Sequence, residues 1–455
     1  MDYNEIIEKQ REFFESGATK TYQFRISALN SLKESLSYYE KELKEALKRD
    51  LNKSHFESYM SEYGVSLQQI NHTAKNLKKW MKPKTRAAGI NVFPGTAYDM
   101  YEPYGIVLIM SPWNYPIQLT MCPLIGAIAA GNCCIVKPSA YTPSSSEIIA
   151  KVIERAFPPE YVATVQGGRE ENKLLLEQRY DYIFFTGSIT VGKWVMEKAA
   201  KNLTPVTLEL GGKSPCIVTA DADVKKAAKK IAFGKILNAG QTCVAPDYVL
   251  VAEELKDQFC AEIAGQFNKM LGDALENDNY PRIVNEKHFD RLLGLMQTSA
   301  VYSGGRADRK ALKIEPTVLV NVTEESSVMG EEIFGPLLPV IPYKTLEEAE
   351  NFVLKREKPL ALYLFTQKKS VEKRIMKKLS SGGACINDTI VHIVCKGLGF
   401  GGVGYSGMGM YHGKHSFETF SHIKGVYRKG RLIDLPMRYH PYTKWKYYVL
   451  RNIMK

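Results

Sequence analysis

Hydrophobic and polar positions follow two different periods along this chain, and the change of period separates its N-terminal part from the rest. Between residues 2 and 82, apolar side chains recur at spacings close to one or two helical turns, for example at Leu29, Leu32, Leu36 and Leu43. This spacing predicts helices. The stretch 83–103 is polar and is punctuated by prolines, which favours a projecting β-hairpin over a layer of the core.

From Tyr104 onward, short apolar runs alternate with segments of helical period. The runs 105–110, 133–136, 161–165, 182–185 and 206–210 are expected to be strands, and 119–130, 144–156, 170–177 and 194–202 are expected to be helices. This alternation predicts an α/β fold with a doubly wound parallel sheet, which binds ligands at the carboxyl ends of its strands. Residues 214–388 show the same alternation and predict a second α/β domain.

Composition agrees with a globular protein of two or three domains, because 455 residues exceed what one core usually holds. The formal net charge of +12 raises the question of an anionic partner. Lysines are, however, mixed with glutamates at helical pair spacing, as in 41–48, and no nucleic-acid motif accompanies them. We therefore expect a solvated basic surface and no nucleic-acid partner.

The tail after Tyr427 is different, because it interleaves basic and aromatic residues. Such a segment touches a membrane surface or forms an arm that packs on its own or a partner subunit, and we favour the arm. The longest apolar stretch, 121–136, is interrupted by proline and glycine and is shorter than the roughly 20 residues that span a bilayer. We expect no stable membrane anchor.

The N-terminus is acidic and lacks the apolar region of a secretory signal, and the eight cysteines contain no CxxC pair. These features predict free thiols in a reducing cytoplasm. The eight histidines show no ligand spacing, so no metal site is expected.

Cys243 differs from the other candidate thiols in its neighbours. Cys133, Cys134, Cys216 and Cys260 lie in apolar strand or helix patterns, whereas Cys243 follows the small and polar run Asn238–Thr242. A thiol is a strong nucleophile where its surroundings favour the thiolate. Taken alone, any one cysteine is more often an inert core residue.

Glu209 lies in an apolar strand just before two glycines. A buried glutamate is costly unless it is paired or used. A salt bridge, for instance with Lys213, and a functional role at the ligand-binding edge are equally compatible with this position.

Two further loops carry candidate chemistry. The turn 186–192 places Gly187, Ser188 and Gly192 before an expected helix, where free N–H groups suit a pyrophosphate; an ordinary turn fits the residues about as well. Asn114 follows the first strand, where its amide could donate to a developing oxyanion. An Asx turn between prolines is the alternative.

In combination and in this order, these segments resemble the aldehyde dehydrogenase superfamily over nearly the whole chain. The resemblance rests on SPWNYP (111–116), IVKPSAYTP (135–143), FFTGSITVG (184–192), LELGGKSP (208–215), NAGQTC (238–243) and EEIFGP (331–336). GQTCVAPDY (240–248), the segment 400–422 and RYHPYTKWK (438–446) are similar to the class 3 subfamily, which is dimeric and uses NAD or NADP.

The resemblance implies a mechanism and a set of roles. Cys243 would form a thiohemiacetal and then a thioester, Asn114 and the Cys243 backbone N–H would hold the oxyanion, and Glu209 would activate the hydrolytic water. Cofactor-binding residues would be Lys137, Ser139, Gly187, Ser188, Gly192, Leu210, Gly211, Glu332 and Phe334. Medium-chain aliphatic or aromatic aldehydes would be the substrates, and Tyr115, Asn114, Leu119, Thr242 and His392 would line their channel.

It also implies a division of the chain into domains. Residues 1–82 and 104–208 would form a Rossmann-type dinucleotide-binding domain, and 209–388 the catalytic thiol domain. Residues 83–103 and 389–430 would form a bridging segment that makes a homodimer, and 431–455 a basic arm.

Two positions depart from the family pattern. Ala140 stands where many relatives have a glutamate that repels a 2′-phosphate, so acceptance of NADP is expected. Tyr405 stands where asparagine is common. Two alternatives stay open: an acylating, coenzyme A-dependent dehydrogenase, against which Glu209 argues, and a non-catalytic binding protein of the same fold.

Overall fold

The N-terminal part of the chain is helical, as its apolar period predicts. The computed structural model describes residues 3–89 and 92–454. Its first helices are α1 (Tyr3–Glu15), α2 (Tyr22–Tyr38), α3 (Glu40–Leu51), α4 (His55–Ser58) and α5 (Gly64–Trp80), with short turns at Ala18–Lys20 and Tyr59–Tyr63. The four leucines whose spacing predicted these helices are fully buried. The helices therefore turn their apolar faces inward against the first sheet.

The first sheet has the strand order β17-β7-β6-β3-β4-β5. Its strands are β3 (Ile106–Met110), β4 (Cys133–Lys137), β5 (Val162–Thr164), β6 (Tyr182–Thr186), β7 (Val206–Glu209) and β17 (Gly407–Met408). All neighbouring pairs are parallel except β17 with β7. The predicted doubly wound α/β class is thus confirmed for this sheet.

Helices cover both faces of this sheet, and β3 shows why its sequence is apolar throughout. Val107 and Ile109 pack into the core formed with α2, α3, α5, α6 (Gln118–Ala130) and α7 (Pro143–Ala156). Ile106, Leu108 and Met110 pack on the opposite face against α1, α8 (Arg169–Leu176) and α9 (Ile189–Ala200). Because successive side chains of a strand point to opposite faces, a strand covered on both sides has no polar positions.

One helix begins earlier than expected. We expected it over 194–202, whereas α9 begins at Ile189 because the Ser188 hydroxyl accepts the N–H of Val191 and caps the helix. A start at the glycine turn places the helix N-terminus directly beside the strand ends.

The second sheet has the order β10-β13-β14-β9-β8-β15-β16. Its strands are β8 (Pro215–Val218), β9 (Tyr248–Ala252), β10 (Ala300–Ser303), β13 (Thr317–Val320), β14 (Leu337–Tyr343), β15 (Ala361–Phe365) and β16 (Gly383–Ile386), and only β10 runs antiparallel to its neighbour. The accompanying helices are α10 (Val224–Ile236), α11 (Lys256–Leu271), α12 (Glu286–Met296), α13 (Ser327–Gly330), α14 (Leu346–Leu354) and α15 (Lys369–Lys378). A small ribbon, β11 (Ala307–Asp308) with β12 (Lys313–Ile314), completes this unit.

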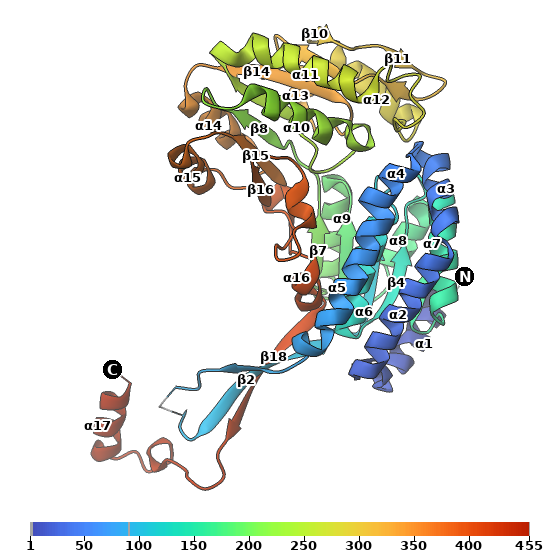
Figure 1. Ribbon diagram of the computed structural model, residues 1–455. Coiled ribbons are helices and arrows are strands. Elements are labelled where there is room, and N and C mark those ends of the chain that lie inside the picture. The colour runs from blue at the N-terminus through green and yellow to red at the C-terminus, as the bar shows by residue number, and fades with distance from the viewer. Residues whose placement is uncertain (1–2, 90–91, 455) are drawn as a thin grey trace.

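A third, three-stranded sheet projects from the two α/β units (Figure 1). Strands β1 (Lys84–Arg86) and β2 (Gly95–Pro103) form the predicted hairpin, although Ile90 and Asn91 lie outside the described residues. Strand β18 (Ser421–Lys429) pairs with β2 along its whole length. Of the segment 389–430, β18 alone joins this sheet, while β17 joins the first sheet and α16 (Gly413–Thr419) packs on α6. The division into domains stays a prediction.

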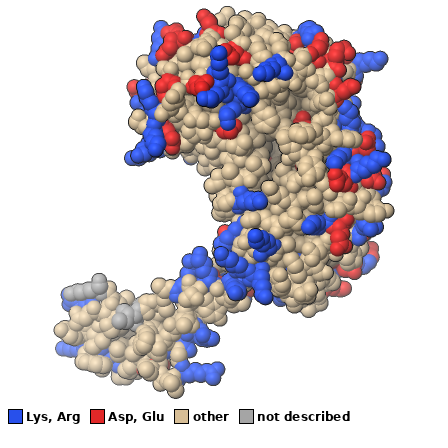
Figure 2. Space-filling model, viewed as in Figure 1, with Lys and Arg blue, Asp and Glu red and all other residues tan. Residues whose placement is uncertain are grey.

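The C-terminal tail continues from the projecting sheet as a one-turn helix (Pro436–Arg438) and α17 (Lys444–Ile453). On the face shown in Figure 2, basic and acidic side chains alternate over the α/β units, whereas the projecting part carries basic ones. Among the described residues, no helix combines the length and apolar character needed to cross a membrane.

Candidate active site

The candidate residues of the first sheet gather at one edge because they follow strands that all run in the same direction. Met110, the last residue of β3, lies in register with Lys137 at the end of β4, and Thr186 of β6 lies in register with Glu209 of β7. The Asn114 loop, the glycine turn and Glu209 therefore meet at the carboxyl ends, as the fold class predicts.

Glu209 is a buried carboxyl without a partner. Only 2% of the residue is exposed, and neither carboxylate oxygen has a hydrogen-bond partner in the described part of the chain. Burial raises the pKa of Glu209 well above its ordinary value. Lys213, the partner considered from the sequence, instead pairs with Asp247. An unpaired buried carboxyl of this kind is costly to the fold and is typical of a catalytic base.

Cys243 lies on a strained loop between α10 and β9. Asn238, Ala239 and Gly240 all adopt left-handed backbone angles, with φ values of 51°, 52° and 73°. At Gly240 a Cβ atom would lie 2.3 Å from the carbonyl oxygen of Gly335, so only glycine fits. Strain of this kind persists where the surrounding structure holds a functional residue in place.

The Cys243 thiol is the only half-buried one among the eight cysteines, all of which are described and free. Burial, followed by the negative charges of Glu332 and Glu209, raises the pKa of this thiol, while the backbone N–H groups of Cys243 and Val244 act in the opposite direction. The proton of this thiol is therefore held more tightly than that of an ordinary cysteine.

Asn114 forms hydrogen bonds with the loop 238–243 that carries Cys243, here called the thiol loop, rather than within its own turn. Its Nδ2 donates to the carbonyl oxygen of Gln241 at 3.0 Å, and its own carbonyl oxygen accepts from Asn238 Nδ2 at 2.8 Å. These bonds join segments about 125 residues apart in the sequence. The Asx turn considered from the sequence does not account for them, and the amide nitrogen keeps a second hydrogen to donate.

Two charged residues at this site were not singled out from the sequence. Lys53 is fully buried and donates to Glu62 Oε1 at 2.5 Å and to the carbonyl oxygen of Asn114 at 2.8 Å. Their nine-residue separation does not match the i,i+4 spacing of the surface Lys–Glu pairs such as Glu5–Lys9, and no other pattern in the sequence singles them out. Only the burial of both partners does.

The glycine turn lies against Glu209 and Leu210. The Gly187 N–H donates to the Glu209 carbonyl oxygen at 3.0 Å, and a Cβ on Gly192 would lie 2.6 Å from Leu210 Cδ2. The hydroxyl of Thr186 is buried and, within residues 3–89 and 92–454, unpartnered. Free N–H groups of the α9 N-terminus and this unused hydroxyl fit a pyrophosphate group.

Two more of the predicted cofactor residues, Lys137 and Ser139, lie at and just after the end of β4. Lys137 is buried and donates to the carbonyl oxygens of Pro138 and Gly167, at 2.8 and 2.6 Å, and burial lowers its pKa to about 8. Ser139 Oγ accepts the N–H of Tyr141, which fixes the loop that carries the exposed Ala140.

Glu332 lies so close to Gly211 that a Cβ there would lie 1.8 Å from its Oε2. Burial raises the pKa of Glu332 to about 8. Phe334, with a φ of 48°, packs its ring against Trp113, with the ring centroids 5.4 Å apart. These contacts place Glu332 beside Gly211 and Phe334 beside Trp113. Tyr405 lies under the ammonium of Lys193 near the start of α9, 4.6 Å from ring centroid to nitrogen.

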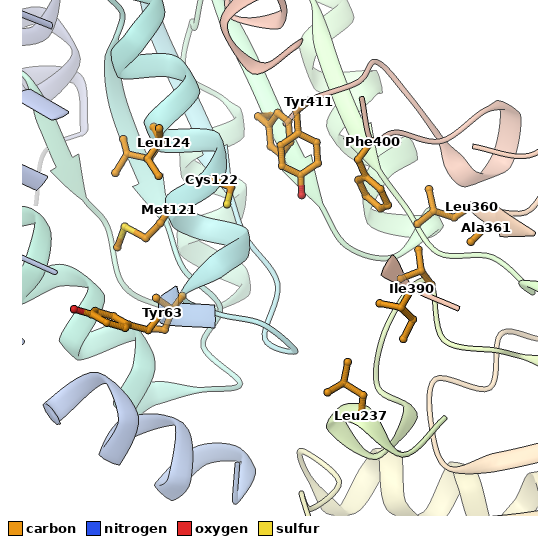
Figure 3. Packing of buried hydrophobic residues seen from close by; sticks show 14 of the residues in the cluster. Tyr63, Met121, Cys122, Leu124, Leu237, Leu360, Ala361, Ile390, Phe400 and Tyr411 are labelled. Carbon is orange, nitrogen blue, oxygen red and sulfur yellow. The ribbon is translucent and has the colours of Figure 1, made fainter. Parts of the chain in front are cut away.

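An apolar cavity of about 230 Å³ leads to Cys243. Its lining residues are Met60, Ser61, Val65, Tyr115, Gln118, Leu119, Phe233, Leu237, Thr242, Cys243, Val244, Ile390, Val391, Ile393, Val394, Phe400, Tyr411 and His412. Leu237, Ile390, Phe400 and Tyr411 lie on the wall opposite helix α6 (Figure 3). Uncharged side chains make up this lining, and they include His412, because burial lowers its pKa to about 4 and so favours the neutral imidazole.

Three of the five channel residues expected from the sequence, Tyr115, Leu119 and Thr242, line this cavity. Asn114 and His392 fall outside this lining. His392 is buried, with its Nδ1 3.1 Å from Cys385 Sγ, so its expected place in the channel is wrong. In the described residues, no group of three or more His, Cys, Asp or Glu side chains is arranged to hold a metal ion.

Comparison with known proteins gives consistent matches over the full length. The aldehyde dehydrogenase family model matches residues 1–426. A 4,4'-diaponeurosporen-aldehyde dehydrogenase of Staphylococcus aureus is 45% identical, over 97% of this chain and 98% of the relative. Aldehyde dehydrogenase family 3 member B1 of Rattus norvegicus is 44% identical, over 100% of this chain and 97% of the relative.

Solved structures give the same result. The substrate-bound state of Staphylococcus aureus AldH superimposes with a TM-score of 0.97 at 43% identity, over 99% of both chains. An NAD⁺ complex of aldehyde dehydrogenase from Bacillus cereus superimposes with a TM-score of 0.85 at 26% identity, over 94% of this chain and 88% of that chain.

Proposed function

Since this chain belongs to the aldehyde dehydrogenase family and is an oxidoreductase that acts on aldehydes, we propose that it oxidises them to carboxylic acids through a thioester on Cys243. The observation that carries the proposal is Glu209, a buried carboxyl that has no hydrogen-bond partner among the described residues and whose negative charge raises the pKa of the Cys243 thiol. A fold that merely bound aldehydes would gain nothing from leaving this carboxyl unpaired.

In this mechanism the Cys243 thiol gives up its proton to solvent, and the resulting thiolate sulfur attacks the aldehyde carbonyl carbon. The Asn114 amide and the Cys243 backbone N–H donate to the resulting oxyanion, and each such donor contributes about 3 kcal/mol to transition-state stabilisation. A nicotinamide, when bound, accepts the hydride that converts the adduct to a thioester. Glu209 then takes a proton from the attacking water, the carbon–sulfur bond breaks, and the acid leaves.

The residues at the strand ends support NAD or NADP as the cofactor. Gly187, Ser188, Gly192 and the unused Thr186 hydroxyl would hold the pyrophosphate, and Lys137 and Ser139 the adenosine ribose. Leu210, Gly211, Glu332 and Phe334 would surround the nicotinamide and its ribose.

The cavity supports uncharged, apolar substrates, because its walls would leave a charged group without a partner. Medium-chain aliphatic and aromatic aldehydes are of this kind. The test follows absorbance of the reduced nicotinamide with hexanal or benzaldehyde and either cofactor. Turnover supports the proposal, whereas the absence of turnover with both cofactors and several aldehydes contradicts it.

We expect NADP to be accepted with a turnover constant comparable to that of NAD, because Ala140 presents no negative charge to a 2′-phosphate. Ala140→Glu is expected to lower kcat/KM for NADP by about 10- to 100-fold, which corresponds to a repulsion between like charges of about 1.4 to 2.7 kcal/mol. The neutral Ala140→Gln controls for the larger side chain. A strong preference of the unmodified enzyme for NAD would refute the expectation.

We further propose a homodimer formed through the projecting sheet. Strand β18 is the edge of that sheet, and an open edge pairs readily with another chain. The segment beyond it exposes Leu432 (98%), Trp445 (60%) and Tyr448 (67%), more apolar surface than an isolated arm usually carries.

Light scattering of the purified protein should give twice the chain mass of 51.3 kDa. Ile423→Glu, on the exposed face of β18, should shift the mass toward one chain, while the same change at Leu203, 91% exposed and away from this sheet, should not. A single-chain mass for the unmodified protein would exclude the dimer.

The eight free thiols support a reducing, cytoplasmic location.

A further inference from the structure

Lys53 is a fully buried cation outside the residues that the proposed mechanism uses. It lies between α3 and α4, and its ammonium contacts Glu62 Oε1 at 2.5 Å, the Asn114 carbonyl oxygen at 2.8 Å and the Tyr115 ring at 3.9 Å from the centroid. Burying an ion pair rarely improves stability over a well-packed apolar pair. The role of Lys53 is therefore better judged from the groups that it contacts than from a contribution to stability.

Glu62 holds the loop that carries Asn114 from the other side. Its Oε2 accepts the N–H of Ile117 at 2.8 Å and that of Gln118 at 3.3 Å, at the beginning of α6. A carboxylate at a helix N-terminus satisfies N–H groups that have no partner within the helix. The Lys53–Glu62 pair thus clamps the backbone on both sides of the Asn114–Pro116 turn.

The clamp also reaches the thiol loop. The Asn114 carbonyl oxygen is shared between Lys53 Nζ and Asn238 Nδ2, while Asn114 Nδ2 donates to Gln241. Tyr115, which lies beneath the Lys53 ammonium, bonds through its hydroxyl to Thr242 Oγ1 at 2.7 Å. Thr242 directly precedes Cys243, so both loops that form the oxyanion site meet at this one cation.

We propose that Lys53, held by Glu62, is a positioning residue that fixes the Asn114 amide relative to Cys243. The inference rests on the proposed function, because it assigns Asn114 to the oxyanion. Lys53 touches neither the cavity nor the thiol. It contacts the site through the Asn114 backbone and the Tyr115 ring, and its charge also acts on Glu57, whose Oε1 accepts the Asn238 N–H at 2.8 Å.

A double-mutant cycle tests this assignment. Lys53→Met, which keeps the length of the side chain and removes its charge, should lower kcat by about 10- to 100-fold with KM little changed, as expected for a misplaced catalytic group. Asn114→Ala should cost about 100- to 1,000-fold. In the Asn114→Ala background, Lys53→Met should cost less than about twofold more, because the group that it positions is gone.

A matched control removes another buried lysine. Lys313 donates to the carbonyl oxygens of Leu275 and Asn277, at 3.0 and 2.9 Å, in the second α/β unit. Lys313→Met should lower the melting temperature and leave kcat unchanged. Equal losses from Lys53→Met in both backgrounds, or an unchanged kcat in folded Lys53→Met, would overturn the proposal.

Two additions keep the test decisive. If Lys53→Met does not fold, Glu62→Gln weakens the same clamp while retaining an acceptor for α6, and it should show the same dependence on Asn114.

Hydrolysis of p-nitrophenyl acetate, measured in the same cycle, uses the thiol and the oxyanion donors without a cofactor or an aldehyde. Ester hydrolysis that depends on Cys243 and Lys53 without aldehyde oxidation would retain the positioning role and reject the proposed function. Dehydrogenase activity that Lys53→Met leaves unchanged would retain the proposed function and reject the positioning role.

Discussion

Cys243→Ala is expected to abolish aldehyde-dependent reduction of NAD and NADP. No other cysteine lines the cavity that reaches the thiol loop, so no second sulfur can replace it within the described residues. Loss of a nucleophile that acts as part of a unit costs about a millionfold in kcat, which places the remaining rate below detection. The measurement is absorbance of the reduced nicotinamide with hexanal and with benzaldehyde.

Cys395→Ala provides the matched control, because Cys395 is the exposed thiol of the chain. It should retain the activity of the unmodified enzyme. Equal circular dichroism and equal melting temperatures for both variants would exclude misfolding as the cause. Retention of more than a trace of activity by Cys243→Ala would show that the covalent mechanism is wrong.

Glu209→Gln has the second-largest expected effect, and its effect is confined to one half of the reaction. The variant should release about one reduced nicotinamide per active site in a rapid burst and then slow by about 100- to 10,000-fold, the usual contribution of a general base. The thioester then accumulates. Intact-protein mass spectrometry after mixing with hexanal should show the acyl group on Cys243.

The same residue sets the expected pH dependence. Burial raises the pKa of Glu209, so the proton is held more tightly than by an ordinary carboxyl. The active form is the carboxylate, and its fraction grows as pH rises. The steady-state rate of the unmodified enzyme should therefore still increase with pH above the range in which an ordinary carboxyl has lost its proton, and this increase should disappear in Glu209→Gln.

Glu350→Gln is the matched control for Glu209→Gln, since Glu350 is fully buried but paired with Arg374 and Lys378. It should lower stability and leave both burst and steady rate intact. If the unmodified enzyme itself gave a burst and then stalled until coenzyme A was added, the acylating alternative would be indicated. Absence of any burst in Glu209→Gln would place Glu209 before the thioester instead of after it.

The candidate site could be predicted in part because its residues lie at positions that local patterns define. Glu209 ends an apolar strand before two glycines, and Gly187 and Ser188 directly follow another, so the topology of a parallel sheet brings them to one edge. The Cys243 loop could be located by its small and polar composition. Its left-handed backbone at Asn238 and Ala239 could not, because alanine gives no such signal.

What the sequence by itself determined was the alternation of buried strands and helices, the two α/β units, the hairpin and the strand-end residues. These follow from periodicity and turn chemistry, which are local. Only the tertiary structure decided that Lys213 pairs with Asp247 and leaves Glu209 alone, that His392 lies beside Cys385, and that Lys53 reaches Asn114. Partner choice depends on distances between segments far apart in the chain. For charged side chains, moreover, burial decides whether a lysine is a solvated surface group or a structural clamp.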